Sequence, residues 1–542
     1  MMNEAPNTLV APCIEYAQSV GSMCARVFVS RQGSAAFGDG KSAGVKPGAS
    51  CAVWSSSETE AVSNAGASTT KRANMFHARG TGLLALSARP LAALLPVPAA
   101  FAAGGVLARW WLERAPHRLE TALAQPLVVV DGWGAYGGVA LAILTGTVFV
   151  AAIALVLAMR GSDRKGGPGS LAEIELCAAL AIAFAIGWPF VFSTDVSAYA
   201  AYGTMALDGL DPYAPLPPGA RGTFLDQARE GAAPLPFPPC PYGPLFVAVA
   251  TAIVRIAAPL GPAATLLALR VSAGLAFLGS IALLHRALAG ATPQRRDLAL
   301  CAYGLNPLCL WSVAEGHNDA FLLLAIFGAA VLARRRPALG AFVFGLSPVL
   351  KAPGAAFALA DALDAWLVGR RLRLRIAGAA LAGLALSAIV ALPALRLALS
   401  ELARVHHVPA SLRGQLVMAV PLASAALAAV YGLRRLGLRD AAGHAWLGIA
   451  LALALPQWHP WYALWLVPWC IAAGTGWASR ALWAATISAV IRYLPDATAS
   501  LGPEASHAVE AAAALPLVLA LAGVFPPAFV RNANSIAAKS PP

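Results

Sequence analysis

Two polar segments stand out because each lies directly against a long apolar run. The first begins near Asp195, which follows the run 171–192. The second separates two further runs and reads Glu315-Gly316-His317-Asn318-Asp319. A carboxylate where an apolar helix meets water is partly desolvated, which raises its proton affinity and makes Asp195 a candidate base. Several hydrogen-bonding groups at a membrane edge are costly unless they serve a ligand or one another. We therefore place His317 and Asp319 with Asp195 as candidate catalytic residues.

Each of these assignments has a plainer alternative. Asp195 could be a solvated helix end or a cap for the next segment, and Asn318 or Asp319 could simply cap the following helix. A helix cap needs one such residue rather than four, which favours a functional role for this segment over simple capping. His317 and its acidic neighbours offer too few ligands for a metal site, so we expect no metal.

Two cations, Lys351 and Arg270, are placed to hold an anionic phosphate. Lys351 follows the run 337–350 and stands apart from the other basic residues. Arg270 lies in the first turns of the run 264–285, where snorkelling to lipid headgroups is the alternative. The remaining basic residues near this face are interpreted as a solvated loop: Arg404, His406, His407 and Arg413.

Aromatic residues gather where the run 460–474 begins, in the segment Gln457-Trp458-His459-Pro460-Trp461-Tyr462 and beyond it. An interfacial aromatic belt is the first interpretation. The spacing of four between Trp461, Trp465 and Trp469 also places them on one helical face, where they could line a groove for a sugar or a prenyl chain. His459 lies among these rings and is included as a candidate binding residue.

The composition indicates which elements must position these residues. Of the 542 residues, 58% are hydrophobic and 12% are charged, whereas soluble domains carry about 25% charged residues. This composition excludes an ordinary soluble enzyme, a disordered protein and a disulfide scaffold. It predicts an all-α polytopic membrane protein of about 14 (12–14) transmembrane helices. The predicted spans are 83–107, 137–158, 171–192, 264–285, 297–314, 318–333, 337–350, 354–368, 376–395, 414–431, 441–457, 460–474, 480–493 and 507–530.

The distribution of charge sets the predicted topology. The net charge is +13, but the Lys and Arg residues cluster in short loops between the spans, and these loops fall on one side of the membrane, as the positive-inside rule requires. We therefore do not expect nucleic acid as a partner. This pattern holds only if the apolar run 243–259 does not cross, so we predict an interfacial or re-entrant helix there. The candidate residues then share the outer face with the long loop 193–263. This loop has ten prolines from Pro212 to Pro244 and is predicted to be non-helical there.

The chain divides into five predicted parts. Residues 1–74 are predicted to be disordered, or untranslated if Met75 is the start, and 75–160 form N-terminal transmembrane helices beginning with an uncleaved anchor. Residues 161–395 form the module that carries the candidate site. Residues 396–530 form further transmembrane helices, and 531–542 are a cytoplasmic tail.

Seven short motifs together resemble a known group of enzymes. They are Asp195-Val196-Ser197-Ala198-Tyr199, Gly209-Leu210-Asp211-Pro212-Tyr213, Tyr242-Gly243-Pro244-Leu245, Asn306-Pro307-Leu308, Gly316-His317-Asn318-Asp319, Lys351-Ala352-Pro353 and Pro460-Trp461-Tyr462. In this order, over residues of about 130–480, they resemble GT-C membrane glycosyltransferases. More narrowly, they resemble the polyprenyl-phosphate-mannose-dependent α-(1→6)-mannopyranosyltransferases of actinobacterial envelope biosynthesis, which are related to glycosyltransferase family 87.

The resemblance implies an inverting transfer of a hexose from a polyprenyl-phosphate sugar to an envelope glycan or glycolipid. The hexose would be mannose, as in the enzymes that the chain resembles. Asp195 would be the general base, and Arg270 and Lys351 would face the leaving phosphate. His317 and Asp319 would bind sugar hydroxyls or steady the base. The remaining candidate binding residues are Tyr199, Asp211, Tyr213, Tyr242, Asn318 and His459.

The resemblance also implies no metal, no nucleotide donor and no cofactor. The partners would be the donor, a lipid-linked or glycan acceptor and membrane lipids, with the site facing outward from a bacterial inner membrane. The alternatives are a secondary transporter or flippase of a lipid or sugar, which would require inverted repeats and midplane polar residues, and a structural partner of an envelope complex.

Overall fold

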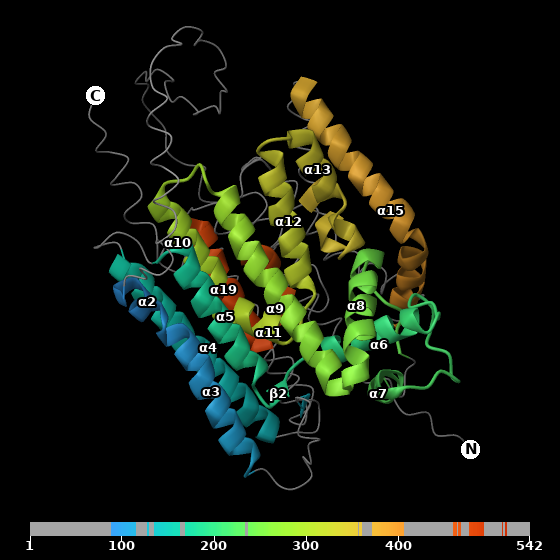
Figure 1. Cartoon of the computed structure of the whole chain (residues 1–542), viewed down its shortest axis with the longest axis horizontal. Coiled ribbons are helices and arrows are strands. Elements are labelled where there is room, and N and C mark those ends of the chain that lie inside the picture. The colour runs from blue at the N-terminus through green and yellow to red at the C-terminus, as the bar shows by residue number, and fades with distance from the viewer. Residues whose placement is uncertain are drawn as a thin grey trace, which may run out of the picture. The chain divides into compact units, whose positions relative to one another are not determined.

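The structure of the protein, a computed structural model, describes most of the chain between residues 88 and 405 and short parts beyond it (Figure 1). The described residues are 88–114, 127–128, 135–162, 169–232, 237–355, 357–359, 362, 371–405, 459–462, 464–467, 476–492, 512 and 515–516. The predicted segments 1–74, 414–431, 441–457 and 531–542 lie outside them, as does nearly all of 507–530.

The described residues are predominantly helical, as the sequence predicted. The helices of the first part are α2 (Ala88–Leu94), α3 (Pro96–Leu112), α4 (Ala135–Ser162), α5 (Leu171–Ile186), α6 (Asp195–Leu207), α7 (Thr223–Ala232) and α8 (Pro244–Ala257), with the 3-10 helix η2 (Ala258–Leu260). They are followed by α9 (Pro262–Ala287), α10 (Pro293–Gly304), α11 (Pro307–Ala314), α12 (Asp319–Ala333), α13 (Pro337–Gly345), η3 (Ser347–Val349), α15 (Arg371–Val405), η4 (Pro460–Tyr462) and α19 (Gly476–Arg492). Two short strands, β1 (Leu127–Val128) and β2 (Phe190–Val191), pair in parallel.

Proline sets many of the helix starts. The helices α3, α8, α9, α10, α11 and α13 begin with proline. Proline has no N–H to leave unpaired in the first turn, and its fixed φ already suits a helix. The many prolines of the sequence therefore divide the apolar runs into shorter helices rather than preventing helix formation.

Four described helical segments are long and apolar enough to cross a membrane: Leu91–Leu112, Tyr136–Arg160, Pro262–Ala287 and Arg373–Leu392. The pair α10 and α11, bent by 45°, makes a fifth if it is one span. These segments match the predicted spans 83–107, 137–158, 264–285, 376–395 and 297–314. The predicted number of about 14 is not confirmed by the part of the chain that the structure describes.

Several predicted runs within the described residues form helices too short to count as spans. The helix α5 has 16 residues and ends before Gly187, and α12 has 15. The run 337–350 is split into α13 and η3 at Ser347-Pro348. A straight crossing needs about 20 residues, so none of these helices alone is long enough to count as a span. The helix α5 is shorter than its predicted run 171–192, whereas α12 matches its run 318–333, which was itself short.

The segment predicted to be interfacial forms α8 and η2. It is apolar from Pro244 to Leu260 but too short to be a candidate span. One face of α8 is buried and includes Phe246 and Val254, whereas Leu245 and Ile256 are exposed. A short helix that buries one apolar face and exposes another suits a membrane interface, although its place in a bilayer stays a prediction.

The prediction that the loop after Pro212 is non-helical is wrong at one place. The helix α7 occupies Thr223–Ala232, where Arg229 pairs with Asp226 at 2.8 Å. The physical reason is local: the prolines lie on either side and leave residues 219–233 without one.

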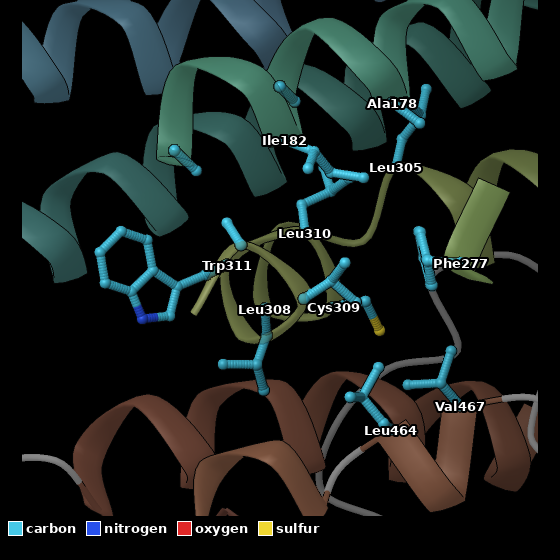
Figure 2. Close-up of a cluster of buried hydrophobic side chains, with 14 of the residues drawn as sticks. Ala178, Ile182, Phe277, Leu305, Leu308, Cys309, Leu310, Trp311, Leu464 and Val467 are labelled. Carbon is cyan, nitrogen blue, oxygen red and sulfur yellow. The ribbon is translucent and has the colours of Figure 1, made fainter. Parts of the chain in front are cut away.

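The packing that supports the candidate site centres on α11, all of whose residues are buried. Asn306 caps this helix, its side chain accepting hydrogen bonds from the backbone N–H groups of Leu308 and Cys309. Figure 2 shows α11 between side chains of α5, of α9 and of the segment 464–467. Because α11 is held on all sides, the polar residues that follow it are placed rigidly.

Candidate active site

Asp195 is the first residue of α6 and lies at the junction between that helix and the extended residues after α5. Its backbone N–H donates to Ser193 Oγ at 3.1 Å. Tyr199, one turn further along α6, donates its hydroxyl to Asp195 Oδ2 at 3.1 Å, and the Tyr242 hydroxyl lies 3.5 Å from the same oxygen. The carboxylate side chain is 22% exposed. It is thus oriented by two phenols while keeping access to solvent or a ligand.

His317 lies between two carboxylates. Its Nδ1 is 3.2 Å from Asp195 Oδ2 and its Nε2 is 3.3 Å from Glu315 Oε2. The His317 and Glu315 side chains are both 0% exposed. The turn that allows this arrangement depends on Gly316, which has a φ of +93° and would place a Cβ 3.1 Å from Val196. An imidazole with a carboxylate at each nitrogen is stabilised in its protonated form.

The charges around Asp195 overturn the expectation of a raised proton affinity. Burial does act in that direction, but the contact with His317 and the positive charges of His317, Lys351 and His459 outweigh it and lower the pKa of Asp195 to about 2. For His317, burial opposes the charged form, and the two carboxylates overcome it, raising the pKa to about 9. At neutral pH the pair is therefore a carboxylate facing an imidazolium.

A second ion pair joins Asp319, the first residue of α12, to Lys351. Lys351 Nζ lies 2.7 and 2.9 Å from the two oxygens of Asp319, and the Trp465 indole N–H also donates to that carboxylate. The side chains of Lys351 and Asp319 are 9% and 0% exposed. The Lys351 ammonium lies 5.6 Å from the ring centroids of Tyr242, Tyr462 and Trp465, which is within cation–π range.

The aromatic segment after 458 packs into this site. Trp461 is stacked between two histidines, with ring centroids 3.9 Å from His317 and 4.4 Å from His459, and Tyr462 stacks on Trp465 at 4.3 Å. Trp461 and Trp465 are buried. Their faces are occupied by protein rings, so these two form a wall of the site rather than an exposed belt. Gln457, Trp458 and Trp469 lie outside the described residues.

Arg270 is buried but does not reach these carboxylates. Its guanidinium donates to the backbone carbonyls of Ala314 and Ala185, and it interacts with the charge of Glu315. It thus fixes the end of α11 directly before Glu315. Snorkelling is excluded for this conformation because the side chain points into the protein.

The remaining candidate residues fall into two groups. Asn318 is 2% exposed, and its side-chain amide has no partner among the described residues, while its backbone N–H lies 3.5 Å from the Tyr199 hydroxyl. Asp211 and Tyr213 instead lie in the loop after α6. The Asp211 carboxylate is exposed and accepts the Tyr213 N–H at 2.9 Å, a turn contact that does not link it to Asp195.

Glu315 was not assigned to the candidate site from the sequence, and Trp461 and Trp465 were expected only as part of an aromatic belt or, alternatively, of a groove. Glu315 belongs to the polar segment already noted, and its position beside His317 was the available signal. The two tryptophans are separated from Lys351 by more than a hundred residues, so no local spacing could indicate their contacts. The described residues contain no group of three or more His, Cys, Asp or Glu side chains arranged to hold a metal ion.

Gly243 joins the start of α8 to the segment that carries Lys351. Its N–H donates to the Leu350 carbonyl at 3.1 Å, and a Cβ there would lie 2.1 Å from the Val349 carbonyl oxygen. We expect Gly243→Ala to destabilise the protein by about 1–3 kcal/mol and to lower activity, because backbone rather than a side chain must move. The measurement is the thermal unfolding of the purified protein, with Gly138→Ala as the control because a Cβ at Gly138 meets open space. Equal behaviour of the two variants would contradict this packing.

The ion pair between Asp195 and His317 predicts how stability depends on pH. The pKa of His317 is above its ordinary 6.5, so its contribution is complete below that pH and is lost as pH rises through about 9. The pKa of Asp195 is below its ordinary 3.8, so its contribution is complete above that pH and is lost only toward about 2. We expect the unfolding temperature to fall between about pH 6.5 and pH 9, the unfolded-state and folded-state pKa values of His317, and this fall to be reduced in His317→Gln. If the unfolding temperature of His317→Gln falls at alkaline pH as much as that of the wild type, another titrating group is responsible for the fall.

Similarity to known proteins shows which family the chain belongs to. A family model described as "Alpha-(1->6)-mannopyranosyltransferase, N-terminal domain" matches residues 97–368, half of the chain. The chain belongs to this family. Alpha-(1->6)-mannopyranosyltransferase A of Mycobacterium tuberculosis (strain ATCC 25618 / H37Rv) is 32% identical over 230 residues. That alignment covers 41% of this chain and 42% of the relative, so it spans less than half the length of either. No solved structure matches the chain.

The family match includes both ion pairs but not the whole site. Asp195, Glu315, His317, Asp319 and Lys351 lie within residues 97–368. The segment that carries His459, Trp461 and Trp465 lies beyond them and completes the site through space. The candidate site therefore combines residues of the matched region with residues from a distant part of the chain.

Proposed function

We propose that this protein is a membrane mannosyltransferase that transfers mannose from a polyprenyl-phosphate sugar to an envelope glycan or glycolipid. The observation that carries the proposal is Asp195, a carboxylate held in its ionised form at the partly exposed edge of a buried polar site, in a chain of this family. A base must be deprotonated before it can take a proton, and the surrounding cations keep Asp195 in that state.

In the proposed reaction, an acceptor hydroxyl oxygen attacks the anomeric carbon while the bond from that carbon to the phosphate oxygen breaks. The hydroxyl proton passes to Asp195, and the bonding electrons leave with the polyprenyl phosphate. Attack opposite to the leaving group inverts the anomeric configuration. Asp195 is a weak base because of its low pKa, and the proton transfer becomes favourable as the hydroxyl oxygen bonds to carbon and grows acidic.

Stabilisation of the leaving phosphate falls to Lys351 in this proposal. Negative charge develops on the phosphate in the transition state, so a cation aimed at it lowers the barrier. Arg270 is the weaker candidate because backbone carbonyls already engage its guanidinium. Asn318, with a buried amide that has no partner among the described residues, and the phenols of Tyr199 and Tyr242 are assigned to the sugar hydroxyls.

The arrangement of α9 and α12 supports a site at one surface of the membrane. Both helices run from the site, where Gly316 lies against Arg270, to a basic end where Arg334 donates to the Arg286 carbonyl at 2.7 Å. At 1.5 Å per residue, α12 separates Asp319 from that end by about 22 Å. Under the positive-inside rule the basic end is cytoplasmic, so we place the site on the outer face of a bacterial inner membrane.

The proposal is tested by supplying donors to the purified full-length protein. Polyprenyl-phosphate mannose, polyprenyl-phosphate glucose and GDP-mannose are compared with a membrane glycolipid acceptor, and the product anomer is determined by NMR. We expect transfer from polyprenyl-phosphate mannose with an α product from a β-linked donor. Transfer from GDP-mannose alone, or retention of configuration, would overturn the proposal.

A further inference from the structure

Glu315 is a buried acid in the site that the proposed reaction does not use. It lies at the end of α11, and its side chain is fully buried. A carboxylate in such surroundings is costly unless its charge is compensated. Its contacts therefore indicate what it contributes to the site.

The two oxygens of Glu315 contact two different parts of the site. Oε1 accepts a hydrogen bond from the Phe192 N–H, three residues before Asp195. Oε2 contacts His317 Nε2. A single side chain therefore restrains the backbone that leads to the base and the histidine that contacts it.

The surroundings of His317 favour one protonation state. Asp195 faces one ring nitrogen and Glu315 the other, while Trp461 covers one face of the ring. A neutral imidazole would have to present an acceptor nitrogen to one of the two carboxylates, which is unfavourable. An imidazolium donates through Nε2 to Glu315 and places its positive charge, with Nδ1 3.2 Å from Asp195 Oδ2, beside the other carboxylate.

The other charged groups near His317 that belong to the described residues have partners or contacts of their own. Lys351 is paired with Asp319, and Arg270 interacts with the charge of Glu315. His459 stacks on the opposite face of Trp461 and affects the charge state of Asp195. With His317 protonated, the acids Asp195, Glu315 and Asp319 are balanced by the cations His317, Lys351 and Arg270.

We propose that Glu315 is a positioning residue that keeps His317 as a permanent imidazolium, so that His317 acts as a fixed cation beside Asp195 and not as a carrier of the transferred proton. The role of this imidazolium in catalysis rests on the proposed function. The proton that Asp195 receives then leaves through its exposed edge to solvent, because His317 has no vacant nitrogen to accept it.

The test is the titration of His317 in the full-length protein. With ¹³C-labelled histidine, His317→Gln identifies the signal of residue 317 among nine histidines. In Glu315→Gln the amide oxygen can still accept from the Phe192 N–H, whereas the negative charge and the acceptor that faces His317 Nε2 are both removed. We therefore expect the pKa of His317 to fall by about 1 unit or more. Glu315→Asp keeps the charge and is expected to retain most of the elevation. Glu173→Gln, a buried acid at the start of α5, is the matched control and should leave the titration unchanged.

An unchanged pKa of His317 in Glu315→Gln would overturn the proposal, since a purely structural Glu315 predicts that result. If Glu315→Gln does not fold, the wild-type titration decides: a value near that of free histidine overturns the proposal. The titration of His317 needs no substrate, so it can be measured whether or not the protein transfers mannose. Failure of the proposed function would show separately, as the absence of transfer by the wild-type protein. Where transfer is observed, the alkaline limb of kcat/KM should move to lower pH in Glu315→Gln by the same amount.

Discussion

Asp195→Asn is expected to lower the rate of mannosyl transfer by about 10²–10⁴-fold, the usual contribution of a general base. The amide has nearly the shape of the carboxylate and can still accept the Tyr199 hydroxyl, but it cannot take a proton from the acceptor. The comparison is kcat for purified wild type and variant at equal donor concentration. The KM for the donor should change little, because the substitution removes charge at the acceptor side.

The matched control is Asp208→Asn at the other end of α6. Asp208 is exposed and lies outside the site, so its substitution should leave the rate and the amount of folded protein unchanged. Asp195→Asn also leaves the His317 imidazolium without one counter-charge, and its folded yield must be measured alongside. A well-folded Asp195→Asn protein with wild-type kcat would remove Asp195 from the mechanism.

Lys351→Met is expected to lose both activity and stability. It leaves the Asp319 carboxylate buried without its cation, and breaking a buried pair from one side costs about 3–5 kcal/mol. The Trp465 indole N–H remains as a donor to Asp319 but carries no charge. The measurements are the unfolding temperature in detergent and the rate of transfer.

A double variant separates the two effects. In Lys351→Met with Asp319→Asn no buried charge is unpaired, and the amide oxygen can still accept from Trp465. We expect most of the stability to return while transfer remains lost, because the cation assigned to the phosphate is absent. Recovery of activity together with stability would show that Lys351 serves the fold alone.

The sequence was informative about which residues belong to the site and much less about how they interact. Asp195, His317, Asp319 and Lys351 were recognised by their places at the ends of apolar runs and by the family resemblance, and the structure brings them together. Their pairing could not be read from spacing: Asp319 and Lys351 are 32 positions apart, and their contact depends on how α12 packs near η3.

The proton affinity of Asp195 shows a general limit of reasoning from position. Desolvation at a helix end was correctly identified, but its effect on the pKa was outweighed by His317, Lys351 and His459, which come from three separate parts of the chain. The lengths of the helices show another limit. Apolar runs predicted their existence, while proline and glycine divided them at places where composition alone indicated continuous spans.

The structure of the full-length protein with a non-transferable phosphonate analogue of polyprenyl-phosphate mannose tests the central claim most directly. The account predicts the anomeric carbon of the sugar beside the Asp195 carboxylate, with space for an acceptor hydroxyl between them and the phosphonate on the side of Lys351. A sugar bound away from Asp195, or a phosphonate held at the basic ends of α9 and α12, would contradict it.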